Sequence, residues 1–224
     1  MVISLILLGL IPSFAWLVFF LKEDVHPEPK KMIAKVFMAG ALMTIFAAVI
    51  QFLLQKIFIS FSSSFFVFAV IEEFFKFLTV YLVVRKSRFF DEPIDAMIYM
   101  ITAALGFAMV ENIAVALNAS NIQEAIGAMT LRFVGATLLH ALTSGIVGYY
   151  WAKGLIVKSV GHWSLSLVIV KGLIIASLLH MIFNYLILIS KEQILIYPTI
   201  FLIIIALFVF WDFERIKTAK QTQN

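Results

Sequence analysis

The chain has 224 residues, of which 63% are hydrophobic and 13% charged, and its formal net charge is +4. Soluble domains contain about 45–50% apolar and about 25% charged residues, so this composition excludes a soluble globular domain. The absence of cysteine excludes disulfides, thiolate metal ligands and a cysteine nucleophile. A small, scattered positive charge does not favour nucleic-acid binding, and the long apolar runs are unlike the alternating strands of a membrane β-barrel. We therefore expect an all-α, polytopic transmembrane helical bundle.

Apolar segments follow one another along the whole chain, and a membrane span needs roughly 20 such residues. The first segment lacks a basic leading region and a small-residue cleavage site, so we expect a retained span rather than a signal peptide. No connection is long enough for a second soluble domain, so residues 1–224 are expected to form a single integral-membrane domain. The predicted spans, seven in all, lie near Val2–Leu21, Ile33–Leu54, Phe65–Val84, Ile94–Leu117, Ala128–Trp151, Val168–Ile189 and Ile194–Trp211.

Lysine and arginine are distributed unevenly between the connections. The second, fourth and sixth connections contain only Lys56 and Lys191, whereas twelve basic residues lie in the other connections and the tail. Because basic residues concentrate in cytoplasmic loops, this bias predicts an N-terminus outside and a C-terminus in the cytoplasm. The twelve residues are Lys22, Lys30, Lys31, Lys35, Arg85, Lys86, Arg88, Lys153, Lys158, Arg215, Lys217 and Lys220.

The third predicted span carries three charged residues at membrane depth, in the segment Val70-Ile-Glu-Glu-Phe-Phe-Lys76. Each such group costs at least ~2.5–3.5 kcal/mol on insertion scales, so its presence requires a reason. At about 100° per residue, Lys76 lies between Glu72 and Glu73 and can pair with either. One glutamate is then left without a partner on its own helix. A purely structural ion pair explains this surplus carboxylate poorly.

Polar residues also occur inside the next three predicted spans. With a rise of ~1.5 Å per residue, Glu72 and Glu111 lie roughly 9–10 Å below the outer boundary. By the same rise, His180 and His140 lie roughly 14 and 18 Å below it, still within the outer half of a ~30 Å core. Because these four residues lie at similar depths in the outer half of the membrane, we expect them to share one polar cavity that opens towards the outer face. Arg132 lies near the end of its span, and we expect it to extend its charge to the interface. The polar residues of the three spans are Glu111, Asn112, His140, His180 and Asn184.

Glutamate and histidine in a confined wet pocket suit hydrolysis. A carboxylate can take a proton from water attacking a peptide carbonyl, while histidine or asparagine donates to the oxyanion or protonates the leaving amine. Two histidines and a glutamate can also hold Zn²⁺ with an open position for water. The compact H-E-x-x-H spacing is absent, so metal ligands would come from separate helices. The spacing slightly favours metal-free hydrolysis, which implies no cofactor, with Zn²⁺ as the alternative. Candidate ligands are Glu72, Glu73, Glu111, His140 and His180.

Several of these segments resemble one family. Glu72-Glu-Phe-Phe-Lys76 is similar to the E-E-x-x-K motif of the PrsW intramembrane proteases, distant relatives of the type II CAAX prenyl proteases. Phe90-Asp-Glu-Pro-Ile-Asp95 and Gly106-Phe-Ala-Met-Val-Glu-Asn112 are similar to its F-D-E-P-x-D-G and F-x-x-x-E-N segments. The motifs occur in order and extend over nearly the whole chain.

The remaining motifs match as well, with small departures. His140 and His180-Met-Ile-Phe-Asn184 match the third and fourth motifs, H and H-x-x-x-D/N, and Glu28-Pro29 also fits. Ala96 replaces the usual glycine after Asp95, and Asn184 stands where aspartate is common. Asparagine is neither an acid nor a base, so at this position it is expected to orient or hydrogen-bond.

The resemblance implies a protease of the bacterial plasma membrane that makes the first cut, at site 1, in a membrane-anchored anti-sigma factor. The cut would lie on the outer side, and a second protease would then release the sigma factor for a stress response. The implied partners are this protein substrate and the lipid bilayer, without nucleic acid or a small-molecule cofactor. Glu72 and Glu73 would activate water. Glu111, His140 and His180 would complete the site, and the supporting residues would be Lys76, Asn112 and Asn184.

Two other classes of protein also place ionisable residues inside a membrane. An ion-coupled transporter uses them as relays, but it also predicts internal repeats and broken spans at mid-depth, which the sequence does not reveal. A non-catalytic scaffold would keep a polar core for helix packing alone. Replacing Glu72 or Glu73 by glutamine separates these alternatives, because a protease loses cleavage while it still folds and binds its target.

Overall fold

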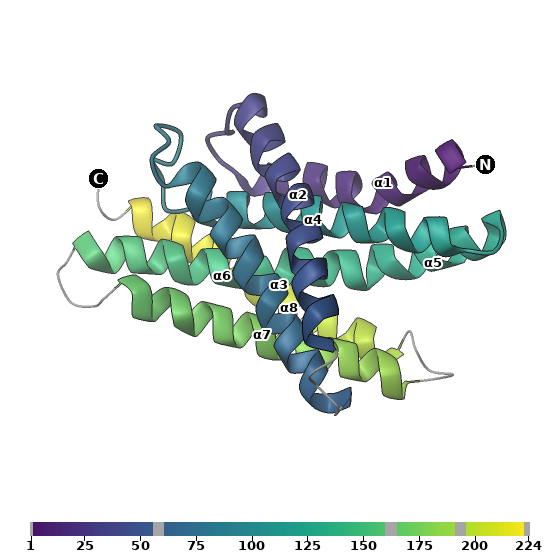
Figure 1. Cartoon of the computed structure of the whole chain (residues 1–224). Helices are drawn as coiled ribbons and strands as arrows, with labels where there is room; N and C mark the ends of the chain where they lie inside the picture. Colours follow the sequence, from purple (N-terminus) through teal and green to yellow (C-terminus); the bar gives the residue numbers. More distant parts are fainter. Residues whose placement is uncertain (1, 56–60, 160–164, 191–195, 222–224) are drawn as a thin grey trace.

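A computed structural model describes residues 2–55, 61–159, 165–190 and 196–221. Within these ranges all regular elements are helices, which confirms the all-α class. Lys56 and Lys191, the two basic residues expected outside, lie outside the described residues, as do the side chains of Lys158 and Lys220. In chain order the elements are α1 (Val2–Phe20), the 3-10 turn η1 (Leu21–Glu23), α2 (Lys30–Gln55), α3 (Phe61–Val84), α4 (Asp95–Asn118), α5 (Ile122–Val134), α6 (Ala136–Ser159), α7 (Leu165–Ile189) and α8 (Ile196–Gln221) (Figure 1).

The helices have the length and composition of membrane spans. Six segments of the described chain qualify, and α5 with α6 counts as one continuous stretch, Ile122–Ile156. α3 is also long, with 24 residues, but it carries the charged residues Glu72, Glu73 and Lys76 near its middle. The chain is therefore a multi-pass membrane protein with six to seven spans.

One predicted span contains a helix break. The predicted segment Ala128–Trp151 begins inside α5 and ends inside α6, and the two helices are separated by Gly135. Gly135 has φ −112° and ψ −102°, outside the helical region, and a Cβ there would lie 2.7 Å from the Leu131 carbonyl oxygen. The run of hydrophobic residues continues across the break, so hydropathy alone does not reveal it.

α4 is the central helix of the bundle. It packs against α1, α2 and α6, and the side chains from Asp95 to Met109 are buried. α2 crosses α4 obliquely, and glycines let the two backbones touch (Figure 1). A Cβ at Gly40 would lie 2.1 Å from the Ala103 carbonyl oxygen, and one at Gly106 would lie 1.9 Å from that of Phe37. Small residues at such crossings bring helices close in membranes.

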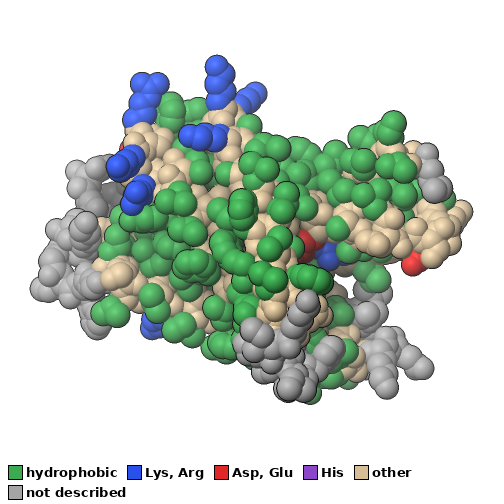
Figure 2. Space-filling view, viewed as in Figure 1, with side chains coloured by type: hydrophobic (Ala, Val, Ile, Leu, Met, Phe, Trp, Pro, Cys, Tyr) green, Lys and Arg blue, Asp and Glu red, His purple; other side chains and the backbone are tan. Residues whose placement is uncertain are grey.

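The basic residues gather at one end of the bundle. Figure 1 places the α1–α2 and α3–α4 connections at this end, and Figure 2 shows Lys and Arg side chains clustered over it. Most of the surface in this view is hydrophobic, as expected for helices that face lipid. Large apolar side chains such as Leu7, Phe46 and Leu207 are more than half exposed. The side of the membrane that the basic end faces remains a prediction.

Candidate functional site

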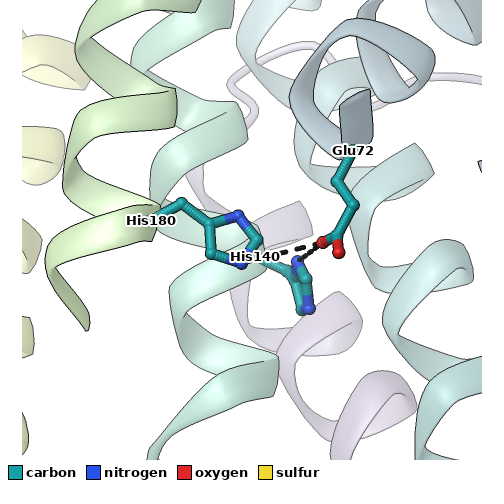
Figure 3. Close-up of side chains that lie close together, drawn as sticks. All are labelled: Glu72, His140 and His180. Carbon is teal, nitrogen blue, oxygen red and sulfur yellow. Dashed lines mark ion pairs between the residues drawn. The ribbon is translucent and has the colours of Figure 1, made fainter. Parts of the chain in front are cut away.

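Acidic and imidazole side chains from four helices meet inside the bundle. Glu72 comes from α3, His140 from α6 and His180 from α7, and both rings point towards the Glu72 carboxylate (Figure 3). Glu72 Oε2 lies 3.7 Å from His180 Nε2 and 4.0 Å from His140 Nδ1. These separations are slightly too long for hydrogen bonds, which leaves space for a small bridging species. The residues predicted to share one cavity therefore do lie together.

Glu73 is a fully buried hydrogen-bond acceptor. Its Oε1 accepts from Lys76 Nζ at 2.8 Å, and it lies 3.0 Å from His180 Nδ1. Thr143 Oγ1 donates to the same oxygen at 3.1 Å, and Ser144 Oγ donates to Oε2 at 3.4 Å. Both carboxylate oxygens are thus occupied, as a buried charge requires. Glu73 is the glutamate that pairs with Lys76.

Glu72 differs from its neighbour because it keeps one free oxygen. Its Oε1 accepts a hydrogen bond from Gln51 Nε2 on α2 at 2.9 Å. Its Oε2 is buried and has no hydrogen-bond partner, which is true of no other buried side-chain oxygen or nitrogen among the described residues. A buried acceptor without a partner costs about 1–3 kcal/mol, so this oxygen marks a place where a ligand is expected.

The neighbours of His140 determine its tautomer. Lys76 Nζ lies 2.7 Å from His140 Nδ1, and His140 Nε2 lies 3.0 Å from Glu111 Oε2 on α4. An ammonium group only donates hydrogen bonds, so Nδ1 accepts and Nε2 carries the proton that is donated to Glu111. His180 has the complementary arrangement, with Nδ1 towards Glu73 and Nε2 towards Glu72. Each ring is held by a carboxylate on the side away from Glu72.

Arg132 belongs to the polar network, although the sequence predicts that it extends to the interface. Its guanidinium donates to Glu111 Oε2 at 2.8 Å and to the Asn112 side-chain oxygen. Asn112 in turn contacts Thr137 and Ser13, which links α4 to α6 and α1. The expectation for Arg132 was wrong, because the break before α6 directs α5 so that this side chain meets Glu111.

Asn184 lies apart from the other predicted residues. It shares a face of α7 with His180, but among the described residues no hydrogen bond joins it to Glu72, Glu73 or His180. It lines a different cavity of about 510 Å³ between α5, α7 and α8, together with Arg132. Of the predicted site residues, Glu73, Lys76, Glu111 and His180 thus belong to the network around Glu72 and His140, Asn112 joins it through Arg132 and Glu111, and Asn184 stands apart.

The geometry fits a divalent metal. One ligand atom each from Glu72, His140 and His180 lie within 4.8 Å of one another. Two nitrogens and one carboxylate oxygen form a common set of ligands for catalytic zinc, and the unpartnered Glu72 oxygen faces both rings. Glu73 and Glu111 would orient the rings, as carboxylates do for metal-bound histidines. His140 would bind the metal through Nδ1, the nitrogen that Lys76 Nζ contacts at 2.7 Å, so Lys76 would give up this contact and keep its ion pair with Glu73.

Sequence reasoning missed Gln51, Thr143 and Ser144 as members of the site. Gln51 is a polar amide inside the apolar second half of α2, a signal that could have indicated a buried partner. Thr143 and Ser144 follow His140 by one helical turn on α6, but short hydroxyl side chains are common inside membrane helices, so they carried no signal.

The fold and the site define a polytopic membrane protein with a buried carboxylate–imidazole centre suited to hydrolysis. The model of the PrsW family, described as intramembrane metalloproteases, matches residues 28–211. The chain therefore belongs to this family and is a peptidase.

Relatives named protease PrsW are similar along the chain. The protein of Geobacillus kaustophilus is 36% identical over 154 residues. The aligned part covers 67% of this chain and 66% of that relative, just under two thirds of its length. The protein of Oceanobacillus iheyensis is 31% identical over 186 residues, 82% of either chain. The protein of Halalkalibacterium halodurans is 27% identical over 97% of this chain and 98% of its own. Among solved structures, none matches this chain.

Proposed function

We propose that this chain hydrolyses a peptide bond of a membrane-anchored protein and that Glu72 accepts the proton of the attacking water. The unpartnered Oε2 of Glu72 carries the proposal, because it is a free acceptor that faces two imidazoles at 3.7 and 4.0 Å, too far for direct hydrogen bonds. A general base must have a free lone pair within reach of that water. Glu73 suits this role less, since it is fully buried and both of its oxygens accept hydrogen bonds, so we assign it to positioning Lys76 and His180.

The reaction needs two proton transfers. Water attacks the carbonyl carbon and gives its proton to Glu72, and the carbon–nitrogen bond then breaks. Glu72 then passes this proton to the leaving amine, while Glu73 holds the His180 ring in place at Nδ1. The products are a carboxylic acid and an amine, which ionise to a carboxylate and an ammonium group.

We further propose Zn²⁺ as the metal, held by Glu72, His140 and His180. When bound, it would supply a Lewis acid that polarises the carbonyl and activates water. A carboxylate has two oxygens and about four lone-pair sites, so Glu72 keeps capacity to accept a proton when one oxygen faces a metal. Gln51 uses one of these sites and holds the carboxylate in place.

The proposed substrate is a membrane-anchored anti-sigma factor, cut at site 1 on the outer side of the bacterial plasma membrane. Two features support the outer side. The basic residues lie at the opposite end of the bundle from the α4–α5 connection, and Glu111 and His140 lie towards that connection.

Glu72→Gln tests the proposal directly. We expect cleavage of a co-reconstituted anti-sigma factor in liposomes to fall by about 10²–10⁴-fold, because the amide cannot accept the water proton. Glu214→Gln, at an exposed position of α8, should cleave as the parent does. Thermal unfolding in detergent should show all three proteins folded. Undiminished cleavage by a folded Glu72→Gln variant would rule the proposal out.

Metal dependence is measured separately. Dialysis against a chelator should abolish cleavage and reduce the zinc content measured by atomic absorption, and added Zn²⁺ should restore both. His180→Ala should bind less zinc, because it removes a ligand atom. Full activity of a metal-depleted protein would contradict the assignment of Zn²⁺ while leaving the role of Glu72 intact.

A further inference from the structure

A groove between α2 and α4 leads from the outside of the bundle to the site. It has a volume of about 530 Å³ and is walled by small and branched apolar side chains, among them Ala48 and Val49 on α2 and Ala114 on α4. Its polar members include Gln51 and Glu111. The groove lies beyond the point at which α2 and α4 touch through Gly40 and Gly106. α2 and α4 cross obliquely (Figure 1), and helices that cross in this way separate on either side of their contact, where the groove lies.

The groove is in direct contact with the catalytic cluster. Gln51 donates to Glu72, and Glu111 contacts His140, so each is one hydrogen bond away from a reacting group. Glu111 itself lines the groove, and Glu72 accepts a hydrogen bond from its lining residue Gln51. The side chain of Glu111 is 26% exposed and that of Glu72 13%, whereas Glu73 is fully buried. A molecule therefore reaches the cluster most directly past Glu111.

The mouth of the groove faces the hydrocarbon of a membrane rather than water. Ile45, Val49 and Phe52 at its α2 wall are each more than half exposed and apolar. The second cavity near the site, between α5, α7 and α8, meets the cluster less directly, because its Arg132 reaches His140 only through Glu111. The α2–α4 groove is thus the more direct lateral opening to Glu72.

We propose that this groove receives an extended apolar stretch of the membrane-anchored substrate, which enters sideways from the bilayer. The proposal rests on the proposed proteolytic function and adds the place and chemistry of the substrate. Unwound backbone at membrane depth must lie against protein, where its amide groups find partners. Gln51 and Glu111 supply such partners beside otherwise apolar walls. Ala48 and Ala114 leave room for branched aliphatic side chains such as leucine and valine, which the substrate carries next to the scissile bond.

Disulfide cross-linking tests this location, because the chain has no native cysteine. Single cysteines are placed in the inactive Glu72→Gln background at Ala48 and Ala114 in the groove. A cysteine at Leu188 tests the second cavity. A cysteine at Leu42, which is exposed on α2 and does not line the groove, is the lipid-facing control. The probe is a single-span peptide in liposomes, with one cysteine beside a leucine-rich extended stretch at the outer end of its apolar segment. Copper phenanthroline provides the oxidant.

The expected result is a cross-link yield at Ala48 and Ala114 at least about tenfold above that at Leu42, competed away by excess peptide without cysteine. A higher yield at Leu188, or equal yields at all positions, would overturn the proposal. Cleavage of the same peptide by the parent protein is measured in parallel. Cross-linking without cleavage would support substrate binding in the groove and contradict the proteolytic proposal for this peptide. Cleavage without cross-links at Ala48 and Ala114 would support proteolysis and overturn the proposal that the substrate binds in the groove.

Bulky substitutions provide a second measurement. Ala48→Trp and Ala114→Trp should raise KM for the peptide by about tenfold with little change in kcat, because they fill the groove and leave the cluster intact. Leu42→Trp, at a lipid-facing position of the same helix, should leave both constants at the parent values. Unchanged KM in both folded groove variants would also overturn the proposal.

Discussion

Glu72 and Glu73 are chemically identical neighbours with different hydrogen-bond partners, because a helix turns them in different directions. Glu73 meets hydroxyls of α6, His180 and Lys76, and these groups provide each of its oxygens with at least one partner. Glu72 faces α2 and the gap between the rings, where Gln51 binds one oxygen and nothing in the described chain binds the other. The proposed assignment of Glu72 as the base therefore rests on the distribution of hydrogen-bond donors around each carboxylate.

Gln51 is predicted to be a positioning residue for Glu72. Gln51→Leu removes the donor that orients the carboxylate, so kcat should fall by about tenfold, equivalent to about 1.4 kcal/mol, with a smaller change in KM. Gln55→Leu, one turn further on α2 and exposed, should leave kcat unchanged. Steady-state cleavage kinetics distinguish the two, and an equal effect of both substitutions would argue against positioning.

At the scale of the helices, the crossing of α2 and α4 determines where Gln51 lies relative to Glu72. Gly40 and Gly106 face the backbone of the opposite helix at distances that no Cβ tolerates. Thr44 Oγ1 lies next to the same contact and donates to the Phe107 carbonyl oxygen at 3.3 Å. This contact fixes the angle between the helices and hence the width of the groove beyond it.

Gly106→Ala should therefore destabilise the bundle. The added Cβ would lie 1.9 Å from the Phe37 carbonyl oxygen, so the helices must separate, at a cost of typically 1–3 kcal/mol. Gly127→Ala on α5 is the matched control, because no atom lies within 4 Å of its Cβ position. Alanine is a better helix former, so this control should be neutral or up to about 1 kcal/mol more stable. Thermal unfolding in detergent measures both variants.

Acidic residues at the basic end predict a pH effect on stability. Burial raises the pKa of Glu28 and of Asp24 above their ordinary values, and Tyr99 donates a hydrogen bond to Glu28. Folding therefore disfavours the charged forms. This destabilisation is absent below the ordinary carboxyl pKa values and develops as pH rises through the raised ones.

Glu28→Gln should consequently be more stable than the parent at pH 8 and equal to it near pH 4, where Glu28 is protonated. Solvent screens part of the effect at a half-buried site, so the gain should not exceed about 1 kcal/mol, or about 2–4 °C in Tm. The amide can still accept the Tyr99 hydrogen bond. Melting curves across this pH range test the expectation, and a parent that gains stability relative to the variant with rising pH would contradict it.

At the scale of the whole molecule, the distribution of basic residues predicts how the protein is oriented in the membrane. The connections rich in lysine and arginine lie at one end, so this end is expected in the cytoplasm, with the N-terminus outside. In the cysteine-free chain, Ser120→Cys should react with a membrane-impermeant maleimide in intact cells. Lys86→Cys should react only after permeabilisation. The reverse pattern would show that the site opens towards the cytoplasm.

The sequence by itself determined the helical membrane class, the approximate spans and the residues Glu72, Glu73, Glu111, His140 and His180 as one group. It could do so because burying a charge in hydrocarbon is costly, so every charge inside a span is informative. Helical periodicity also placed Lys76 between the two glutamates.

Only the tertiary structure decided which glutamate pairs with Lys76, how Arg132 joins Glu111, where Gln51 lies and that Asn184 stands apart. These facts depend on helix rotation, on the break at Gly135 and on the angle between α2 and α4. Such quantities arise from packing between segments distant in the chain, and a pattern along one segment contains no information about them.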